Sequence, residues 1–269
     1  MQATAIKQTG VVREINAVLT ILMRGVSVAL KSPGTLIMSL AMPLVMMGMI
    51  GGNLAENMAG GLAFDYGPFM LVGMLVNMLF MMTSQGLTSL VEDRETDFTQ
   101  EILVAPISRC SIIIGTIFAS SFSAIVSSIG TLAVGFLMGI RLGIGQLLAI
   151  LALSPLLCLA AGAFAVLLIG FIRNKTAANM AVMLVTMPQM FLSGAIIPIG
   201  NSSGILHVLS RMMPMTYCLD LVRAVVYAGT PEYAAIVLFN PAVTCIAIAV
   251  LTVLGLAIGT WAFVRSGKK

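Results

Sequence analysis

The segment "PFMLVGMLVNMLFMMTSQGLTSLVEDRETDFTQEILVAPISR" at residues 68–109 places an apolar run directly before a dense cluster of charge. Residues 68–90 carry no charged side chain and are long enough to cross a bilayer, which takes about 20 predominantly apolar residues. Residues 91–109 then carry seven charged side chains in 19 positions. This change predicts a membrane span followed by a polar segment, which is either a plain connector or a surface that the protein uses.

The composition of the whole chain is that of a membrane protein. Its 269 residues are 59% hydrophobic and 9% charged, with a mean hydropathy of +1.07, whereas soluble domains carry about 25% charged residues. We therefore expect one membrane domain over residues 1–269, embedded in the lipid bilayer and without a cleavable signal peptide. The four cysteines form no C-x-x-C pair, so no metal site or disulfide is expected. The net charge of +4 is explained by membrane topology, and no nucleic-acid partner is expected.

Six apolar segments predict an all-α membrane protein with six transmembrane helices. They are Thr35–Gly51, Pro68–Leu90, Cys110–Ile140, Leu142–Ile172, Ala177–Ile199 and Pro241–Val264. The first is short and contains Pro43, and the fifth contains Pro188, which a membrane helix tolerates as a kink.

The positions of Lys and Arg predict the orientation, because cytoplasmic loops collect these residues. With the N-terminus inside, eleven basic residues lie on the cytoplasmic side, and only Arg141, Arg211 and Arg223 lie outside. Both termini, and the charged segment after the second span, are then cytoplasmic in a multi-pass protein of the cell (inner or plasma) membrane.

The segment before the first span predicts an amphipathic helix over residues 11–31. Its polar residues recur three or four positions apart, as on one face of an α-helix. They are Arg13, Asn16, Thr20, Arg24, Ser27 and Lys31. We expect this helix to lie in the cytoplasmic membrane interface, with its basic face toward the headgroups or a partner. The alternative, a further span over Val18–Leu30, would bury Arg24 in lipid.

Residues 200–231, between the fifth and sixth spans, predict a short outer helical hairpin. Glycine and proline clusters at Gly200–Gly204 and Gly229–Pro231 flank two helical stretches, Ile205–Met212 and Met215–Tyr227, each too short to span. They form either an outer cap or a re-entrant hairpin that dips partway into the membrane, where such turns must be covered by protein or water.

Catalytic motifs are missing from the sequence. His207 is the only histidine, so an H-E-x-x-H zinc site is excluded, and neither a G-x-S-x-G nucleophile nor a G-x-x-x-x-G-K-[ST] phosphate loop occurs. The cores of the predicted spans also lack the ionisable residues that mark ion-coupled pathways. An intramembrane enzyme and an ion-coupled secondary transporter are therefore disfavoured, and no catalytic or metal-binding residue is predicted.

Weakly polar residues recur along spans two and five. Asn77 and Ser84 share one face of span two, and Thr186 and Ser193 share one face of span five. One interpretation is hydrogen bonding between helices, worth about 0.6–2 kcal/mol per contact. The other is a weakly polar wall of a substrate path. The candidate path residues are Asn77, Ser84, Gln85, Thr186, Gln189 and Ser193.

The charged segment itself predicts a short cytoplasmic helix over residues 92–106, ended by Pro106. Phe98 and Ile102 provide an apolar face, so the helix suits docking into a groove on a soluble partner. The candidate docking residues are Glu92, Arg94, Glu95, Asp97, Phe98, Glu101, Pro106 and Arg109.

Two stretches resemble the ABC-2 type transporter permeases, the membrane subunits of ATP-binding-cassette exporters. "EDRETDFTQEILVAPISR" at residues 92–109 is similar to the family's E-R-E-x-G-T-x-E-x-L-L-x-x-P-x-S-R. It matches at Arg94, Glu95, Leu103, Pro106, Ser108 and Arg109. Asp97 and Phe98 replace the family's Gly-Thr, and this departure bears on where the helix starts. "QEILVAPISR" is close to the form found in daunorubicin-resistance (drug-efflux) permeases.

The second stretch, "FLSGAIIPIGNSSGILHVLSRMMPMTYCLDLVRAVV" at residues 191–226, resembles the family's F-L-S-G-x-x-x-P followed by P-x-x-Y-x-x-D-x-x-R. The matching residues are Phe191, Leu192, Ser193, Gly194, Pro198, Pro214, Tyr217, Asp220 and Arg223. The two stretches cover about a fifth of the chain, and their order and spacing agree with the family.

The resemblance implies a transport subunit with no cofactor of its own. A second permease chain, identical or different, would pair with it around a central pathway, and two copies of an ABC ATPase, which binds ATP and Mg, would dock below. Residues 92–106 would be the ATPase-coupling helix, and residues 11–31 would move with it. Spans two and five would line the path.

The expected activity is ATP-driven export of an amphipathic or hydrophobic substrate (a drug, an antibiotic or a lipid) by alternating access. The 21 methionines fit this expectation, because their soft side chains adapt to varied apolar ligands. The alternative, export of a polysaccharide or glycolipid, is less well matched by a chain that is 6% aromatic.

Overall fold

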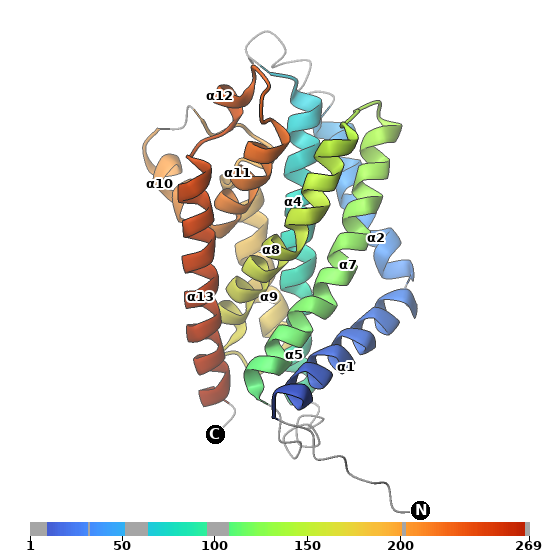
Figure 1. The fold of residues 1–269 in the computed structure, drawn as a ribbon, viewed down its shortest axis with the longest axis vertical. Helices are drawn as coiled ribbons and strands as arrows, with labels where there is room; N and C mark the ends of the chain where they lie inside the picture. The colour runs from blue at the N-terminus through green and yellow to red at the C-terminus, as the bar shows by residue number, and fades with distance from the viewer. Residues whose placement is uncertain (1–9, 32, 52–63, 96–107, 201–202, 267–269) are drawn as a thin grey trace, which may run out of the picture.

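The computed structural model describes residues 10–31, 33–51, 64–95, 108–200 and 203–266, and every regular element in these ranges is helical (Figure 1). The elements are α1 (Gly10–Lys31), α2 (Pro33–Val45), the π-helix η1 (Met46–Gly51), α4 (Tyr66–Gly86), α5 (Ser89–Glu95), α7 (Arg109–Leu137), α8 (Ile144–Ile169), α9 (Lys175–Leu192), α10 (Ile205–Met212), α11 (Pro214–Val226), α12 (Tyr233–Ile236) and α13 (Pro241–Ser266).

Within these ranges, four helical stretches are long and apolar enough to cross a membrane. They are Tyr66–Asp93, Arg109–Leu137, Ile144–Ile169 and Tyr233–Arg265. They correspond to the predicted second, third, fourth and sixth spans, which confirms an all-α membrane protein. The predicted first span is α2 continued by η1, and the predicted fifth is the 18-residue α9. The count of six spans therefore stays a prediction.

The fifth helix ends seven residues before its predicted end at Ile199, so that boundary was wrong. Gly194 has φ +84, in the left-handed region that favours glycine, and the chain turns there. The apolar residues that follow form a buried turn rather than more helix, and the Tyr66 hydroxyl donates to the carbonyl of Ile196 at 2.8 Å. Hydropathy alone could not separate this turn from a span, because both are apolar.

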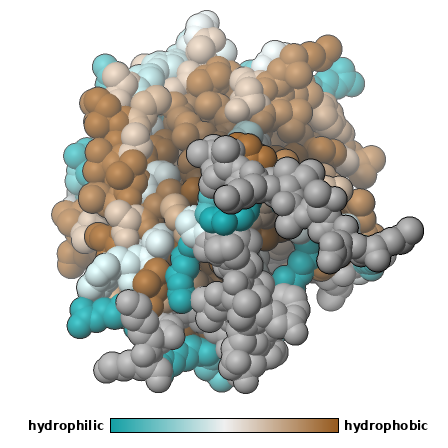
Figure 2. Space-filling model, turned by 60° about the horizontal axis from the view of Figure 1, so that its bottom comes forward, coloured by the Kyte–Doolittle hydropathy of each residue, from teal (hydrophilic) through white to brown (hydrophobic). Residues whose placement is uncertain are grey.

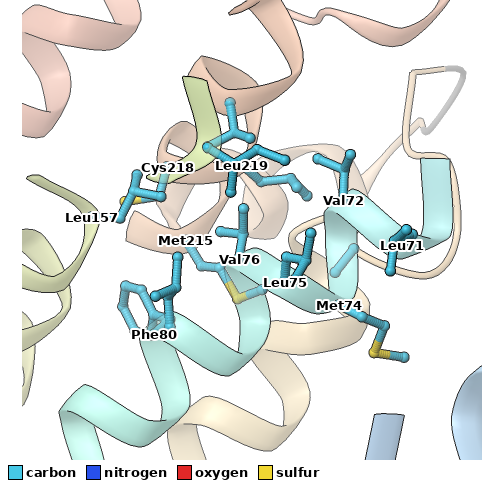
Figure 3. Close-up of a cluster of buried hydrophobic side chains, with 14 of the residues drawn as sticks. Leu71, Val72, Met74, Leu75, Val76, Phe80, Leu157, Met215, Cys218 and Leu219 are labelled. Atoms are coloured by element: carbon cyan, nitrogen blue, oxygen red, sulfur yellow. The ribbon is translucent and has the colours of Figure 1, made fainter. Parts of the chain in front are cut away.

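Helix α4 is the centre of the bundle and packs against α7, α8, α9 and α11. Figure 3 shows the main core, where side chains of α4 such as Val76 and Phe80 meet Leu157 of α8 and Met215 of α11. Gly73 is needed on α4 because a Cβ there would lie 2.0 Å from the carbonyl oxygen of Ala195. The helix is thus surrounded by protein along most of its length.

The two ends of the bundle differ. Helices α1 and α5 and the last turn of α13 lie at one end, and α10, α11 and α12 lie toward the other (Figure 1). Figure 2 looks toward the end that carries α1 and α5 and shows hydrophilic residues gathered there, beneath a largely hydrophobic flank. The elements predicted to meet a cytoplasmic partner therefore share one end of the molecule.

Candidate functional site

Two neighbouring acids near the end of α5 contact basic residues from two other helices. Asp93 Oδ1 lies 3.5 Å from Arg24 Nη2 on α1. Glu92 Oε1 lies 2.5 Å from Nζ of Lys175, the first residue of α9. Because 3.6 residues make one helical turn, neighbouring positions point about 100° apart, and the two acids reach different helices. The acidic pair therefore joins α5 to both α1 and α9.

These ion pairs are partly open to solvent. The side chains of Arg24 and Asp93 are 57% and 26% exposed, and those of Lys175 and Glu92 are 41% and 44% exposed. Exposed pairs contribute about 0–1 kcal/mol each to stability. These pairs therefore contribute little to the stability of the fold, although they connect α5 to α1 and α9.

Local sequence explains how α5 presents the acids. Helix α4 ends at Gly86, where Thr88 Oγ1 donates to the carbonyl of Gln85 and Ser89 Oγ donates to that of Gly86, each at 2.7 Å. These hydroxyls bond carbonyls that the end of a helix leaves without intrahelical partners. Side chains of α5 are then anchored in an apolar cluster shared with α7, α8 and α9. The buried anchors are Leu90 and Val91 of α5, together with Leu87, which precedes the helix as the C-cap of α4.

A third contact joins α1 to the start of α7. Both carboxylate oxygens of Glu14 accept from the backbone N–H of Ser108, at 3.0 and 3.1 Å, and Ser108 is the N-cap of α7. Hydrogen bonds from the Ser111 hydroxyl and from Ser108 hold the pKa of Glu14 below its ordinary value. The negative charge also suits the positive end of the helix dipole. Glu14 was not among the predicted site residues.

Helix α1 packs closely along α7. A Cβ on Gly25 would lie 2.4 Å from the Cβ of Ala119, and Ile21 lies against Gly115. Small residues at these positions let the two helices approach. The predicted basic residues of this helix, Arg13, Arg24 and Lys31, are all exposed.

The predicted coupling helix is described only in part. Glu92 does not begin a helix, as the prediction over 92–106 required, but lies inside α5, which starts at Ser89. Arg94 and Glu95 belong to the same helix, and Arg109 is the half-buried first residue of α7. The predicted docking residues Asp97, Phe98, Glu101 and Pro106 lie outside the described residues.

The candidate path residues lie mostly inside the chain's own bundle. Asn77 Nδ2 donates to Met215 Sδ at 3.8 Å, and Ser84 Oγ donates to the carbonyl of Ala161 at 3.4 Å. Thr186, Gln189 and Ser193 are buried, and Gln85 is half-buried. The contacts of Asn77 and Ser84 are those expected from hydrogen bonding between helices, the first of the two interpretations. Thr186 and Ser193 instead donate to carbonyls of α9 itself, and the Gln189 side-chain amide has no hydrogen-bond partner among the described residues.

The outer hairpin, residues 200–231, contains α10 and α11, and its two short helices confirm the predicted helical stretches. Nearly every residue of α11 is buried, because the helix packs among α4, α8 and α13. Pro214 occupies its first turn, where a missing N–H costs nothing. This burial fits a hairpin that enters the bundle better than a cap resting on it.

Asp220 fixes the start of α13 to this hairpin. Its carboxylate accepts from the backbone N–H groups of Leu238 and Phe239 at 2.7 and 3.1 Å. Thr244 Oγ1 lies 3.3 Å from this carboxylate and equally far from the carbonyl of Asn240, so its one proton is shared between the two acceptors. A buried carboxylate needs such donors, because an unpaired buried charge is costly. The charge of Asp220 therefore holds together the segment that leads into the last helix.

Tyr217 and Arg223 make the remaining contacts of the hairpin. The Tyr217 hydroxyl donates to the carbonyl of Arg211 at 2.7 Å, and its ring lies 5.4 Å from that of Phe239. Arg223 is buried, donates through Nη2 to the carbonyl of Gly194 at 2.9 Å, and lies 3.7 Å over the ring of Phe69.

The fold and these contacts define a polytopic helical membrane protein in which one end carries a charged, partly exposed junction and the other a buried hairpin. The chain belongs to the ABC-2 type transporter family, whose model matches residues 16–227. It is also similar to the candidate transport permease ycf38 of Cyanophora paradoxa, with 26% identity over 197 residues, covering 72% of this chain and 68% of that protein. In this family the matched domain is a transmembrane subunit rather than an enzyme, and it works with an ABC ATPase.

Proposed function

We propose that this chain is the permease subunit of an ATP-binding-cassette exporter that moves an amphipathic or hydrophobic substrate out of the cell. ATP and Mg are bound by a separate ATPase, of which two copies dock on a pair of permease chains. Closure of the ATPases on ATP shifts the permeases between inward-facing and outward-facing states. Membership of the ABC-2 family supports the class of transporter.

The observation that carries the proposal is the pair of contacts at Glu92 and Asp93. The segment to which they belong, residues 92–106, resembles the family's coupling helix. A movement of that segment displaces α5 directly. The ion pairs transmit the movement to Arg24 on α1 and to Lys175 on α9. One docking event then moves three helices together, which an alternating-access cycle requires.

The proposed topology has six spans, with α2–η1 and α9 completing the four long helices. The distribution of Lys and Arg supports cytoplasmic termini in the inner or plasma membrane. Three faces of α1 support its place in the cytoplasmic interface. One packs on α7, one carries the exposed polar residues, and one is exposed and apolar. The exposed apolar residues of this face are Val12, Ile15, Leu19, Met23 and Leu30, and Val28 is exposed on another side of the helix.

Co-purification and coupling assays test the proposal. An ABC ATPase encoded next to this chain is expected to purify with it as a complex and to hydrolyse ATP faster when substrate is present. Charge reversal at Glu95 and Glu101 is expected to leave the permease in the membrane but to separate ATP hydrolysis from export. Failure to form a complex would contradict the proposal of an ATPase partner. Unchanged transport in the double variant would contradict the docking role of residues 92–106.

The substrate class is tested in vesicles that hold the reconstituted complex. A panel of cationic amphipaths, phospholipids and oligosaccharides would be compared for stimulation of ATP hydrolysis and for transport. We expect stimulation by the amphipathic compounds. Stimulation by oligosaccharides alone would assign the chain to polysaccharide or glycolipid export instead.

A further inference from the structure

Helices α8 and α13 touch closely over one part of their length. A Cβ on Gly255 would lie 3.0 Å from the carbonyl oxygen of Ala163, and one on Gly259 would lie 2.8 Å from the backbone nitrogen of Leu167. Small residues allow this approach between membrane helices. Nearer the opposite end, α11 packs against both helices, so the re-entrant hairpin lies where they are no longer in such close contact (Figure 1).

The tip of the hairpin does not fill the whole space between these helices. Below Met212 and Pro214 lies a cavity of about 150 Å³. Phe164 and Leu167 of α8 form one wall, and Leu251 and Gly255 of α13 form the other. The close approach of α8 and α13 at Gly255 therefore bounds the cavity at one end, and the hairpin tip bounds it at the other.

The chemistry of the cavity excludes water as a stable occupant. Its walls are apolar side chains, whereas a buried water needs two to four polar partners. An apolar cavity of about 150 Å³ stays dry and takes up small apolar molecules instead. A partner helix is too wide to enter, since a helix with its side chains is about 10–12 Å across.

The mouth of the cavity faces an apolar surface. Met212 and Leu251 at the lining are 68% and 38% exposed, and Val250 and Leu254 on the same outer side of α13 are about half exposed. On a helix that spans a membrane, a surface of this kind meets hydrocarbon. The apolar group that this medium supplies, and that is narrow enough to enter the cavity, is the acyl chain of a lipid.

We propose that this cavity binds a segment of one acyl chain of a bilayer phospholipid, at a place that none of the candidate path residues lines. The acyl chain fills the space under the hairpin tip. It makes van der Waals contacts with the lining side chains that would be missing if the cavity were empty. Bound lipid therefore supports α10 and α11 in the position seen here. The inference needs only that the chain spans a membrane, so it does not depend on the direction or substrate of transport.

Photochemical labelling tests this site. The full chain would be placed in phosphatidylcholine vesicles that contain a small fraction of phosphatidylcholine with a diazirine in one acyl chain, irradiated, digested and mapped by mass spectrometry. We expect adducts on Met212 and Phe164 well above those on Leu254, which faces lipid outside the cavity. Equal labelling of all three positions would overturn the proposal, as would crosslinks at Met212 to a second protein chain.

Substitutions that fill the cavity can be compared with a matched substitution outside it. Leu251→Trp places a large ring in the mouth and is expected to lower labelling of Met212 several-fold, whereas Val250→Trp, at the next position and outside the lining, is expected to leave it unchanged. If Leu251→Trp does not fold, Ala160→Leu fills the cavity from α8 and carries the same expectation. Unchanged labelling of Met212 in the filled variant would contradict the proposal.

Discussion

Arg223 on α11 donates from Nη2 to the carbonyl oxygen of Gly194 at 2.9 Å, so a buried cation ties the hairpin to the turn that ends α9. The same guanidinium lies 3.7 Å over the ring of Phe69 on α4. One side chain thus connects three elements of the outer half of the bundle. Its geometry explains why an arginine, planar and able to donate while stacked, occupies this position.

Replacing Arg223 by Lys is expected to destabilise the protein. An ammonium keeps the charge but cannot both stack flat on Phe69 and donate to Gly194, and a hydrogen bond to a charged group contributes about 1.5–3 kcal/mol. Thermal unfolding of the detergent-purified protein measures the loss. Arg211→Lys, on the exposed part of the same hairpin, is the control. Its guanidinium lies 5.3 Å from the ring of Phe239 but is open to solvent, where such a contact is weak, so we expect the midpoint to shift little. Equal shifts in both variants would rule out a special role for Arg223.

Asp220 and Thr244 are expected to be energetically coupled. Asp220→Asn removes one acceptor oxygen from a site with three donors, leaving a buried N–H unpaired at a cost of about 1–3 kcal/mol. Thr244→Val removes one donor. In a double-mutant cycle the two changes should cost less together than the sum of the single changes, by at least about 0.5 kcal/mol. Simple additivity would show that the 3.3 Å contact between the side chains contributes nothing.

Gly73→Ala is expected to be poorly tolerated. The new Cβ would lie 2.0 Å from the carbonyl oxygen of Ala195, and backbone must shift to relieve this clash. Such overpacking costs about 1–3 kcal/mol or more, and folded yield after solubilisation should fall. Gly145→Ala on α8 is the matched control, since nothing lies within 4 Å of its added Cβ. Normal yield from Gly73→Ala would mean that α4 and the Ala195 turn are less closely packed than described.

The contact between α1 and α7 is expected to depend on pH through Glu14. Because its pKa lies below the ordinary value, the carboxylate favours docking at neutral pH, and this contribution is lost as the pH falls through the lowered pKa. Cys245→Ser removes the other exposed cysteine. Spin labels on Met23→Cys and on the native, exposed Cys110 then report the separation of the two helices. In the labelled protein that keeps Glu14, the distance between the two spin labels should lengthen at acidic pH. With Glu14→Gln added, it should be altered at neutral pH and change little with pH. A pH-independent distance in both would contradict the assignment.

Much of the fold follows from hydropathy, as α7, α8 and α13 show. Their apolar runs predict each helix to within a few residues, because a span must be both helical and apolar. The end of α9 could not be predicted in this way, since the turn after Gly194 is as apolar as a span. Periodicity showed the polar face of α1 but not the stripe around Gly25 that packs on α7, because small residues carry little hydropathy signal.

The candidate site was predicted as a set of residues and not as a set of contacts. The acids at Glu92 and Asp93 were evident from charge, but their partners Lys175 and Arg24 lie on other helices, and only the packed bundle brings them together. The same holds for Asp220, whose donors follow it by 18 to 24 positions. The Ser108 N-cap is a readable helix-start signal, yet nothing in the sequence pairs it with Glu14.

The most direct test of the account is a charge swap between Glu92 and Lys175 in the permease reconstituted with its ATPase. The measured quantity is substrate transported per ATP hydrolysed. Glu92→Lys and Lys175→Glu, each alone, should keep ATP hydrolysis and lower this ratio, because a movement of α5 then reaches α9 only through their apolar contacts. The double variant restores the ion pair and should recover most of the ratio. Single variants with an unchanged ratio, or a double variant no better than either single one, would contradict coupling through this contact.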